Sequence, residues 1–343
     1  MKMYKLNRTF KQRKIHAMKT IKFIPILTLL IILFTGCPPQ LDKASSWDLC
    51  CTLPDSGVYR DIFFIDADEG WLIGQYERIY HSDNGGESWE LQNSGNRDLS
   101  TVHFLDKQYG WATGLMAAYY TINGGTSWNY VDLFTYGAIW VPFTEEIFFI
   151  DRENVLVFWS RSSYPLIVTR FTFNVDSARF YPLASSLKFP NYLSSTTNVA
   201  NKVWFADVEQ NIYLSTDGGV NWSTGQIEAD SGDISAINDI HFTNEQDGWF
   251  CSNCSVYHSD DGGENWYYKT TLPDSSLGRI YFKKDEGWVM GEKIIYYSSD
   301  GGNSWQAQLQ VDVEEKLVSI SFVNCSNGWA LSESGNVYRY GVE

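Results

Sequence analysis

Basic residues are scarce in this 343-residue sequence once the N-terminal stretch is set aside. Eight of the 26 Lys and Arg residues precede Cys37, in a stretch without Asp or Glu, which leaves 18 against 41 acidic residues and a formal charge of −23. Such a balance repels phosphate backbones and anionic lipid surfaces. We therefore expect no nucleic-acid partner.

Motifs of several catalytic and cofactor sites are also missing. No His, Cys and Asp spacing matches a zinc site, and no glycine-rich loop matches a phosphate-binding or dinucleotide-binding fingerprint. With 44% hydrophobic and 16% aromatic residues, however, the chain can bury a large core, and 20% charged residues is too few for a disordered chain. We expect a globular protein without a cofactor or a bound metal.

The N-terminus has the order of a secretory signal: basic residues, an apolar run over residues 21–34, and small residues before Cys37. The run is too short to span roughly 30 Å of bilayer hydrocarbon. Residues 33–37, Leu-Phe-Thr-Gly-Cys, resemble a bacterial lipobox, although Phe34 stands where Leu is usual. The resemblance implies that Cys37 is lipidated, and a plain cleaved signal with an incidental cysteine is the alternative.

The predicted organisation follows from this leader. We expect a signal peptide over residues 1–36, with Met18 as an alternative start, and a lipidated linker over residues 37–44. The protein is then exported and anchored to a membrane of the bacterial cell envelope, on its periplasmic or surface face.

A motif of the form S/T-x-D/N-x-G-x-x-W, an Asp box, recurs five times. Its polar and aromatic positions are Asn84 and Trp89, Asn123 and Trp128, Asp217 and Trp222, Asp261 and Trp266, and Asp300 and Trp305. A degenerate copy ends at Tyr181 and a partial copy contains Trp47, so that seven aromatic positions recur at steps of 39 to 53 residues. Seven repeats are predicted.

Each complete repeat also contains an alternating strand before a Gly-Trp pair, as in residues 62–64 before Gly70 and Trp71. Four short strands in about 40 residues are typical of a β-propeller blade. We predict an all-β, seven-bladed β-propeller of four-stranded blades over residues 45–343, closed by the N-terminal strand around Trp47. The box glycines permit positive φ, the Asp or Asn binds nearby amides, and the Trp fills the space between sheets, so the boxes are expected to be structural.

The combined pattern, Gly-Trp-x-x-Gly followed by Tyr-x-Ser-x-Asp-Gly-Gly-x-x-Trp, resembles the photosystem II stability and assembly factor family of Asp-box propellers. The resemblance covers residues 45–343 and implies a non-enzymatic scaffold that binds a protein or assists assembly. A basic surface patch is implicated in photosynthetic members, whereas no arginine cluster recurs on the motif here. We therefore expect the scaffold role without the photosystem client.

The alternative function is a secreted carbohydrate-active enzyme, because sialidases and other glycoside hydrolases share Asp boxes. A sialidase needs an Arg-Ile-Pro motif and three arginines around a carboxylate, and the fragments at Arg60 and Arg279 are the nearest that the sequence offers. Predicted inner strands begin at Asp61, Asp239 and Glu146. A hydrolase that uses a pair of carboxylates therefore remains an alternative.

Histidines and cysteines complete the inventory of reactive side chains. Four histidines occupy positions that hold other packing residues in other repeats, and we interpret them as packing: His81, His103, His241 and His258. Cys251 and Cys254 fall at a predicted hairpin turn, where facing residues approach within disulfide range. We predict a disulfide between them, with a redox or metal-binding pair as the alternative. The sequence does not pair Cys50, Cys51 or Cys325.

A protein partner is expected, with carbohydrate as the less favoured ligand. The repeat is broken between Trp128 and Tyr181, where the step of 53 residues is the longest. Aromatic and arginine side chains on loops of a rigid scaffold are typical anchors of recognition. The extra length contains five such candidates, which we place on the face opposite the Asp boxes: Tyr136, Trp140, Phe143, Arg161 and Tyr164. Alternatively, Trp140 and Phe143 only fill the degenerate blade.

Overall fold

The structure is a computed structural model that describes residues 46–341, except for residues 55–56, 115–116, 132–142, 152, 162–163, 175–178, 183–186, 189–192 and 228–233. For several residues between 143 and 226 it describes the backbone alone. All described residues lie in the unit that runs from Cys37 to Glu343. Within them, no helix is long and apolar enough to cross a membrane.

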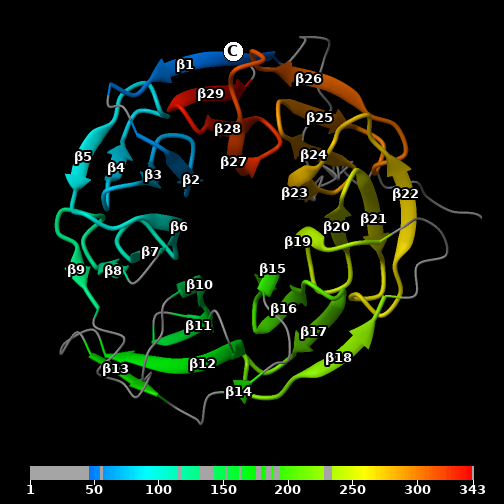
Figure 1. Cartoon of the computed structure of the whole chain (residues 1–343), viewed down its shortest axis with the longest axis horizontal. Helices are drawn as coiled ribbons and strands as arrows, with labels where there is room; N and C mark the ends of the chain where they lie inside the picture. Colours follow the sequence, from blue (N-terminus) through cyan, green and yellow to red (C-terminus); the bar gives the residue numbers. More distant parts are fainter. Residues whose placement is uncertain are drawn as a thin grey trace, which may run out of the picture. The chain divides into compact units, whose positions relative to one another are not determined.

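The described strands form seven antiparallel sheets around a ring (Figure 1). The first three sheets along the chain each run from an inner to an outer strand. They are β2 (Tyr59–Phe64), β3 (Gly70–Gly74), β4 (Ile79–Ser82) and β5 (Glu90–Asn93); β6 (Leu99–Phe104), β7 (Gly110–Gly114), β8 (Ala117–Thr121) and β9 (Asn129–Tyr130); and β10 (Phe143–Phe149), β11 (Asn154–Arg161), β12 (Tyr164–Asn174) and β13 (Arg179–Pro182), with β14 (Leu187–Lys188) also paired to β12.

The next three sheets repeat this order. They are β15 (Leu193–Val199), β16 (Lys202–Asp207), β17 (Asn211–Ser215) and β18 (Ser223–Gln226); β19 (Ile237–Phe242), β20 (Gly248–Ser252), β21 (Ser255–Ser259) and β22 (Tyr267–Thr271); and β23 (Leu277–Lys283), β24 (Glu286–Gly291), β25 (Ile294–Ser298) and β26 (Gln306–Gln310). The all-β propeller predicted from the repeats is confirmed.

The remaining sheet contains strands from both ends of the described chain. It consists of β27 (Leu317–Asn324), β28 (Asn327–Ser332), β29 (Asn336–Gly341) and, outermost, β1 (Ser46–Thr52). Strand β1 runs antiparallel to β29, with Trp47 opposite Tyr340. Trp47 is buried and meets the Phe322 ring edge-on at 5.8 Å, the geometry that box Trp89 has with Phe64 at 5.7 Å.

The sheets pack through a tryptophan stacked on the inner-strand phenylalanine of the next sheet. Trp329 lies on Phe64 with ring centroids 3.6 Å apart and an interplanar angle of 5°. Its Nε1 donates to the Gly85 carbonyl of the next box at 2.8 Å. Four further junctions have the same stack: Trp71 on Phe104, Trp204 on Phe242, Trp249 on Phe282 and Trp288 on Phe322.

The Gly-Trp pair has a steric cause. Phe64 and Gly70 are cross-strand partners, and the Phe64 ring covers the glycine, so that a Cβ added at Gly70 would lie 2.5 Å from it. The corresponding distance is 2.4 Å between Gly248 and Phe242. Only glycine leaves room for the ring that the tryptophan of the preceding sheet stacks on.

The Asp boxes form the turns between the third and fourth strands. In the box that joins β4 to β5, Ser82 Oγ accepts the Gly86 amide at 2.8 Å, and Asn84 Oδ1 accepts the Ser88 amide at 3.0 Å. Both glycines have positive φ, 71° at Gly85 and 90° at Gly86, as do the paired glycines of the other four boxes. The box side chains are therefore satisfied within their own turn.

Replacing Gly248 with Ala tests the steric argument. The new Cβ forces the Phe242 ring off its stack with Trp204, and we expect a loss of about 1–3 kcal/mol in the free energy of unfolding, the usual cost of overpacking. Urea denaturation measures it. Gly278→Ala is the control, because the nearest atom to its Cβ would be the flexible end of Met290 at 3.2 Å, and the Met290 carbonyl oxygen would lie at an ordinary contact distance of 3.8 Å. Equal stability of the two variants would contradict the argument.

Candidate functional site

The inner strands surround a cavity of about 240 Å³ that is lined by Asp61, Asp239 and Arg279, among others. Asp61 accepts the Val102 amide at 3.0 Å through Oδ2 and the Ser319 hydroxyl at 2.7 Å through Oδ1. Asp61 thus links the inner strands on both sides of its own.

Asp239 has a similar bracing role. Its Oδ2 accepts the Ile280 amide at 2.8 Å, and its Oδ1 lies 3.9 Å from Arg279 Nη1. The third acidic residue of the hydrolase alternative, Glu146, lies in β10, and its side chain is not described. Asp61 and Asp239 therefore hold neighbouring inner strands together. This structural role explains why carboxylates occur at these positions, and no catalytic role is needed to explain them.

The histidines pack as the sequence indicated. His103 and His241 lie against Phe63 and Tyr281, with ring centroids 4.8 and 5.0 Å apart, and burial lowers the pKa of each histidine to about 4. His81 and His258 contact carboxylates in the turn between the first two strands of their sheets, Glu69 at 2.7 Å and Asp247 at 2.9 Å. The described residues contain no cluster of His, Cys, Asp and Glu that could hold a metal.

The predicted disulfide between Cys251 and Cys254 is wrong, because both are free thiols. The strand register gives the reason: Cys251 pairs with Val256 and Ser252 with Ser255, so the hairpin has a two-residue turn that contains Cys254. Cys251 is buried among the residues between two sheets, whereas Cys254 lies in the turn. The two are not facing residues.

The predicted partner-binding residues are only partly described. Cys37, Tyr136 and Trp140 lie outside the described residues. The backbone places Phe143 at the start of β10 and pairs it with Ser160.

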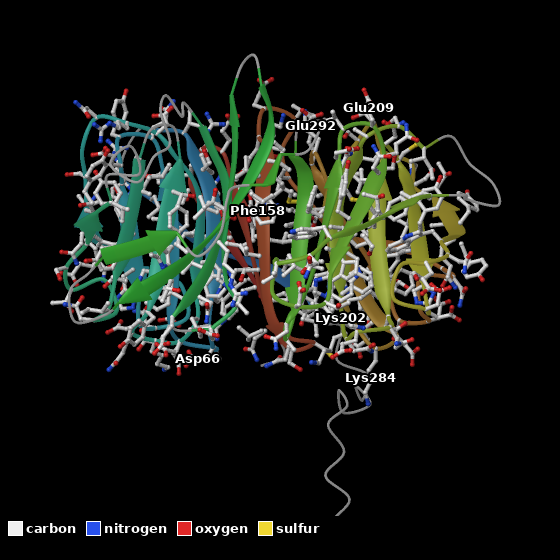
Figure 2. The ribbon with its side chains drawn as sticks, turned by 90° about the horizontal axis from the view of Figure 1, so that it is seen from below. Asp66, Phe158, Lys202, Glu209, Lys284 and Glu292 are labelled. Atoms are coloured by element: carbon white, nitrogen blue, oxygen red, sulfur yellow. The ribbon has the colours of Figure 1, made fainter. Side chains whose placement is uncertain are left out.

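The other two candidates lie in the neighbouring hairpin. Arg161 ends β11 opposite Tyr164, which begins β12. The backbone therefore places Phe143, Arg161 and Tyr164 at one end of their sheet, the end opposite the box turns. In Figure 2 the green β11–β12 hairpin rises at the upper face, the face of Glu209 and Glu292.

Sequence reasoning missed a strained turn on this same face. Tyr76 and Glu77 join β3 to β4, and both have left-handed φ, 63° and 52°. Such a conformation costs about 1–2 kcal/mol for a residue other than glycine, and it persists where the surroundings over-determine it. The Glu77 amide donates to the Arg97 carbonyl and the Gly95 amide to the Tyr76 carbonyl, both at 2.6 Å.

The Glu77 side chain adds to this anchoring. It is 6% exposed, and its Oε1 lies 3.4 Å from Arg97 Nη1. Burial, together with a hydrogen bond to Glu77, raises the pKa of Tyr119 to about 12. The turn is therefore held in place by the connection between β5 and β6 and by the neighbouring sheet.

The anchored turn presents Tyr76, and Tyr130 in the outer strand of the next sheet is a second exposed tyrosine; each has an arginine against its ring. Tyr76 is 50% exposed, and the Arg78 guanidinium lies 5.2 Å from its ring centroid. Tyr130 is 43% exposed, and Arg97 lies at the same distance from it. We call Tyr76, Arg78, Arg97 and Tyr130 the Tyr–Arg surface.

A second cavity, of about 460 Å³, opens on the same face, between β23, β24 and β27. Gly278, Met290 and Leu317 line it, and Arg60, Lys316 and Glu292 bring charge to it. Lys316 Nζ lies 3.5 Å from Glu292 Oε1. The face opposite the boxes thus combines a pocket with exposed aromatic and cationic side chains.

Comparisons with known proteins identify the family. Residues 40–136 and 226–318, together more than half of the chain, match the family described as photosynthesis system II assembly factor YCF48, and residues 213–224 match the BNR/Asp-box repeat. The chain belongs to the YCF48 family. No curated protein matches it.

Solved structures agree on the fold. A structure of YCF48 bound to a D1 peptide is 20% identical, with a TM-score of 0.70 and coverage of 89% of this chain and 98% of that one. YCF48 from Cyanidioschyzon merolae is 18% identical, with a TM-score of 0.68 and coverage of 87% and 99%. The WD40 propeller domain of Doa1 is 13% identical, with a TM-score of 0.64 and coverage of 87% and 98%.

The family consists of assembly factors, and this member is accordingly non-enzymatic. The bracing roles of Asp61 and Asp239 agree with that assignment.

The partly buried histidines of the inner strands predict acid sensitivity. Because His103 keeps a pKa of about 4 when folded against 6.5 for the free side chain, the unfolded chain binds its proton first, and stability falls as the pH drops from 6.5 toward 4. Between pH 6.5 and pH 5, the free energy of unfolding of His103→Phe should therefore fall by about 2 kcal/mol less than that of the unchanged protein. Urea denaturation at both pH values checks it, and an unchanged pH dependence would contradict the packing role.

Proposed function

We propose that this protein is an assembly scaffold that binds a protein partner on the face opposite its Asp boxes. The observation that carries the proposal is the Tyr76–Glu77 turn, where the fold maintains two strained residues and thereby presents an exposed tyrosine against an arginine. Tyr and Arg are the residues that most often supply binding energy in protein interfaces. A rigid anchor also loses little conformational freedom on binding.

A peptide segment is the kind of partner we infer. The solved complex of YCF48 with a D1 peptide supports this inference for a propeller of the same family. One residue separates Tyr130 from residues 132–142, which contain Tyr136 and Trp140. We propose that these two residues, with Phe143, Arg161 and Tyr164, extend the Tyr–Arg surface. The acidic charge of the chain leads us to propose a client other than a photosystem.

Single substitutions test this surface. Tyr76→Ala and Tyr130→Ala should each reduce capture of the co-purifying partner from detergent-solubilised membranes by at least tenfold, while the melting temperature changes little, because both rings are half exposed. The matched control is Tyr267→Ala, whose ring is 46% exposed in the outer strand of a different sheet. Capture reduced equally in all three variants, or in none, would contradict the assignment.

We further propose that the molecule in solution is a seven-bladed ring that depends on β1 for closure. Support comes from the pairing of β1 with β29 and from buried Trp47. Without β1, the edge of β29 and the cavity left by Trp47 are exposed to water.

Deleting residues 46–52 should therefore cost more than the about 3–5 kcal/mol of one buried Trp. The control deletes residues 38–44, an equal length of the predicted linker. Closely matched melting temperatures of the two deletions, measured by circular dichroism, would rule out this dependence.

We propose that the protein is exported and lipid-anchored through Cys37 to the bacterial cell envelope. The lipobox-like residues 33–37 support this location. Two acyl chains anchor a protein stably, where one is marginal. Cys37→Ser should block processing and move the protein from the detergent phase to the aqueous phase in a phase-partitioning assay. If Cys37→Ser partitions like the unchanged protein, the anchor is refuted.

A further inference from the structure

Two adjacent free cysteines, Cys50 and Cys51, lie where the β1 ladder is interrupted. Leu49 pairs with Tyr338 and Cys51 with Val337, so that Cys50 is the extra residue of a β-bulge and has no partner in the ladder. Consecutive side chains of a regular strand point to opposite faces, which would separate two adjacent thiols. A bulge changes the direction of side chains and removes this separation.

The surroundings place both thiols near the same box turn of the next sheet. Cys51 and Trp89 pack against the same buried cluster, and the Cys51 side chain interacts with that of Trp89. Cys50 lies within electrostatic range of Arg339 and Glu87. Glu87 and Trp89 belong to a single box turn of the β2–β5 sheet, so both thiols have this turn as a neighbour.

We propose that Cys50 and Cys51 are a redox-active vicinal dithiol that closes into an internal disulfide when a small-molecule disulfide oxidises it. The thiolate of one cysteine attacks the disulfide, forms a mixed disulfide and releases one thiol. The thiolate of the other cysteine then attacks the sulfur bonded to the protein and releases the second thiol. The protein loses two electrons and two protons, and one disulfide is reduced to two thiols.

The order of attack follows from the acidities. Burial raises the pKa of both thiols, that of Cys51 to about 11, while the charge of Arg339 opposes the rise at Cys50. Cys50 is therefore the first nucleophile, because the thiolate is the reactive form. The rate of oxidation should increase with pH.

The product is strained and hence readily reversed. The Cα atoms of adjacent residues are about 3.8 Å apart across a trans peptide, whereas disulfides usually join Cα atoms at roughly 4.4–6.8 Å. A strained disulfide is more easily reduced. The bulge is the place in β1 where the backbone can adapt, since no ladder pair of Cys50 has to break.

The test uses the full chain, incubated with glutathione disulfide at pH 8, alkylated under denaturing conditions and digested with trypsin. The peptide of residues 44–60 contains Cys50 and Cys51 and no other cysteine. Mass spectrometry should find this peptide unalkylated and lighter by two hydrogen atoms, and fully alkylated after treatment with excess reduced glutathione. Cys251 and Cys254, which share another tryptic peptide, should stay reduced in the same sample.

Single variants separate the steps. In Cys51→Ser, Cys50 should retain one glutathione as a mixed disulfide, because no second thiol displaces it. In Cys50→Ser, the adduct on Cys51 should form at least tenfold more slowly. A stable glutathione adduct on the unchanged protein, or complete alkylation of residues 44–60 after oxidation, would overturn the proposal.

Discussion

The propeller depends on one recurring contact, a tryptophan ring lying flat on a phenylalanine of the next sheet. That phenylalanine covers a glycine on its own sheet and meets a second tryptophan edge-on, as Phe282 does with Trp249 and Trp305. Aromatic pairs in these geometries contribute beyond the area they bury. Among the described residues, four sheets supply rings to both of their junctions, so the stability of each of these sheets depends on its neighbours.

Much of this arrangement could be predicted from the sequence. The Asp boxes and the Gly-Trp pairs recur at fixed spacing, and the spacing alone indicates a propeller. Trp204 escaped notice because Val203 precedes it, although its ring makes the same stack on Phe242. Periodicity finds repeated contacts, but it does not find a repeated contact whose sequence signature has changed.

The candidate site was harder to predict for two physical reasons. A two-residue hairpin turn with positive φ normally contains Asn-Gly or a similar pair, so Tyr76-Glu77 gives no turn signal; tertiary contacts from Gly95 and Arg97 impose the conformation. The Cys251–Cys254 disulfide failed for a related reason. The order of residues does not say which of them occupy the turn, and a shift of one position changes which side chains face each other.

The carboxylates of three Asp boxes are held by hydrogen bonds within their own turns, and this distinguishes the box face from the face that we propose for the partner. Hydrogen bonds from Ser304 lower the pKa of Asp300 to about 2, and hydrogen bonds from their box neighbours also lower the pKa of Asp217 and Asp261, against the opposing effect of burial. These three boxes stay ionised at any physiological pH, and their carboxylates are already used within the turn. On the opposite face, Arg78 and Arg97 lie against tyrosine rings that stay available for contact.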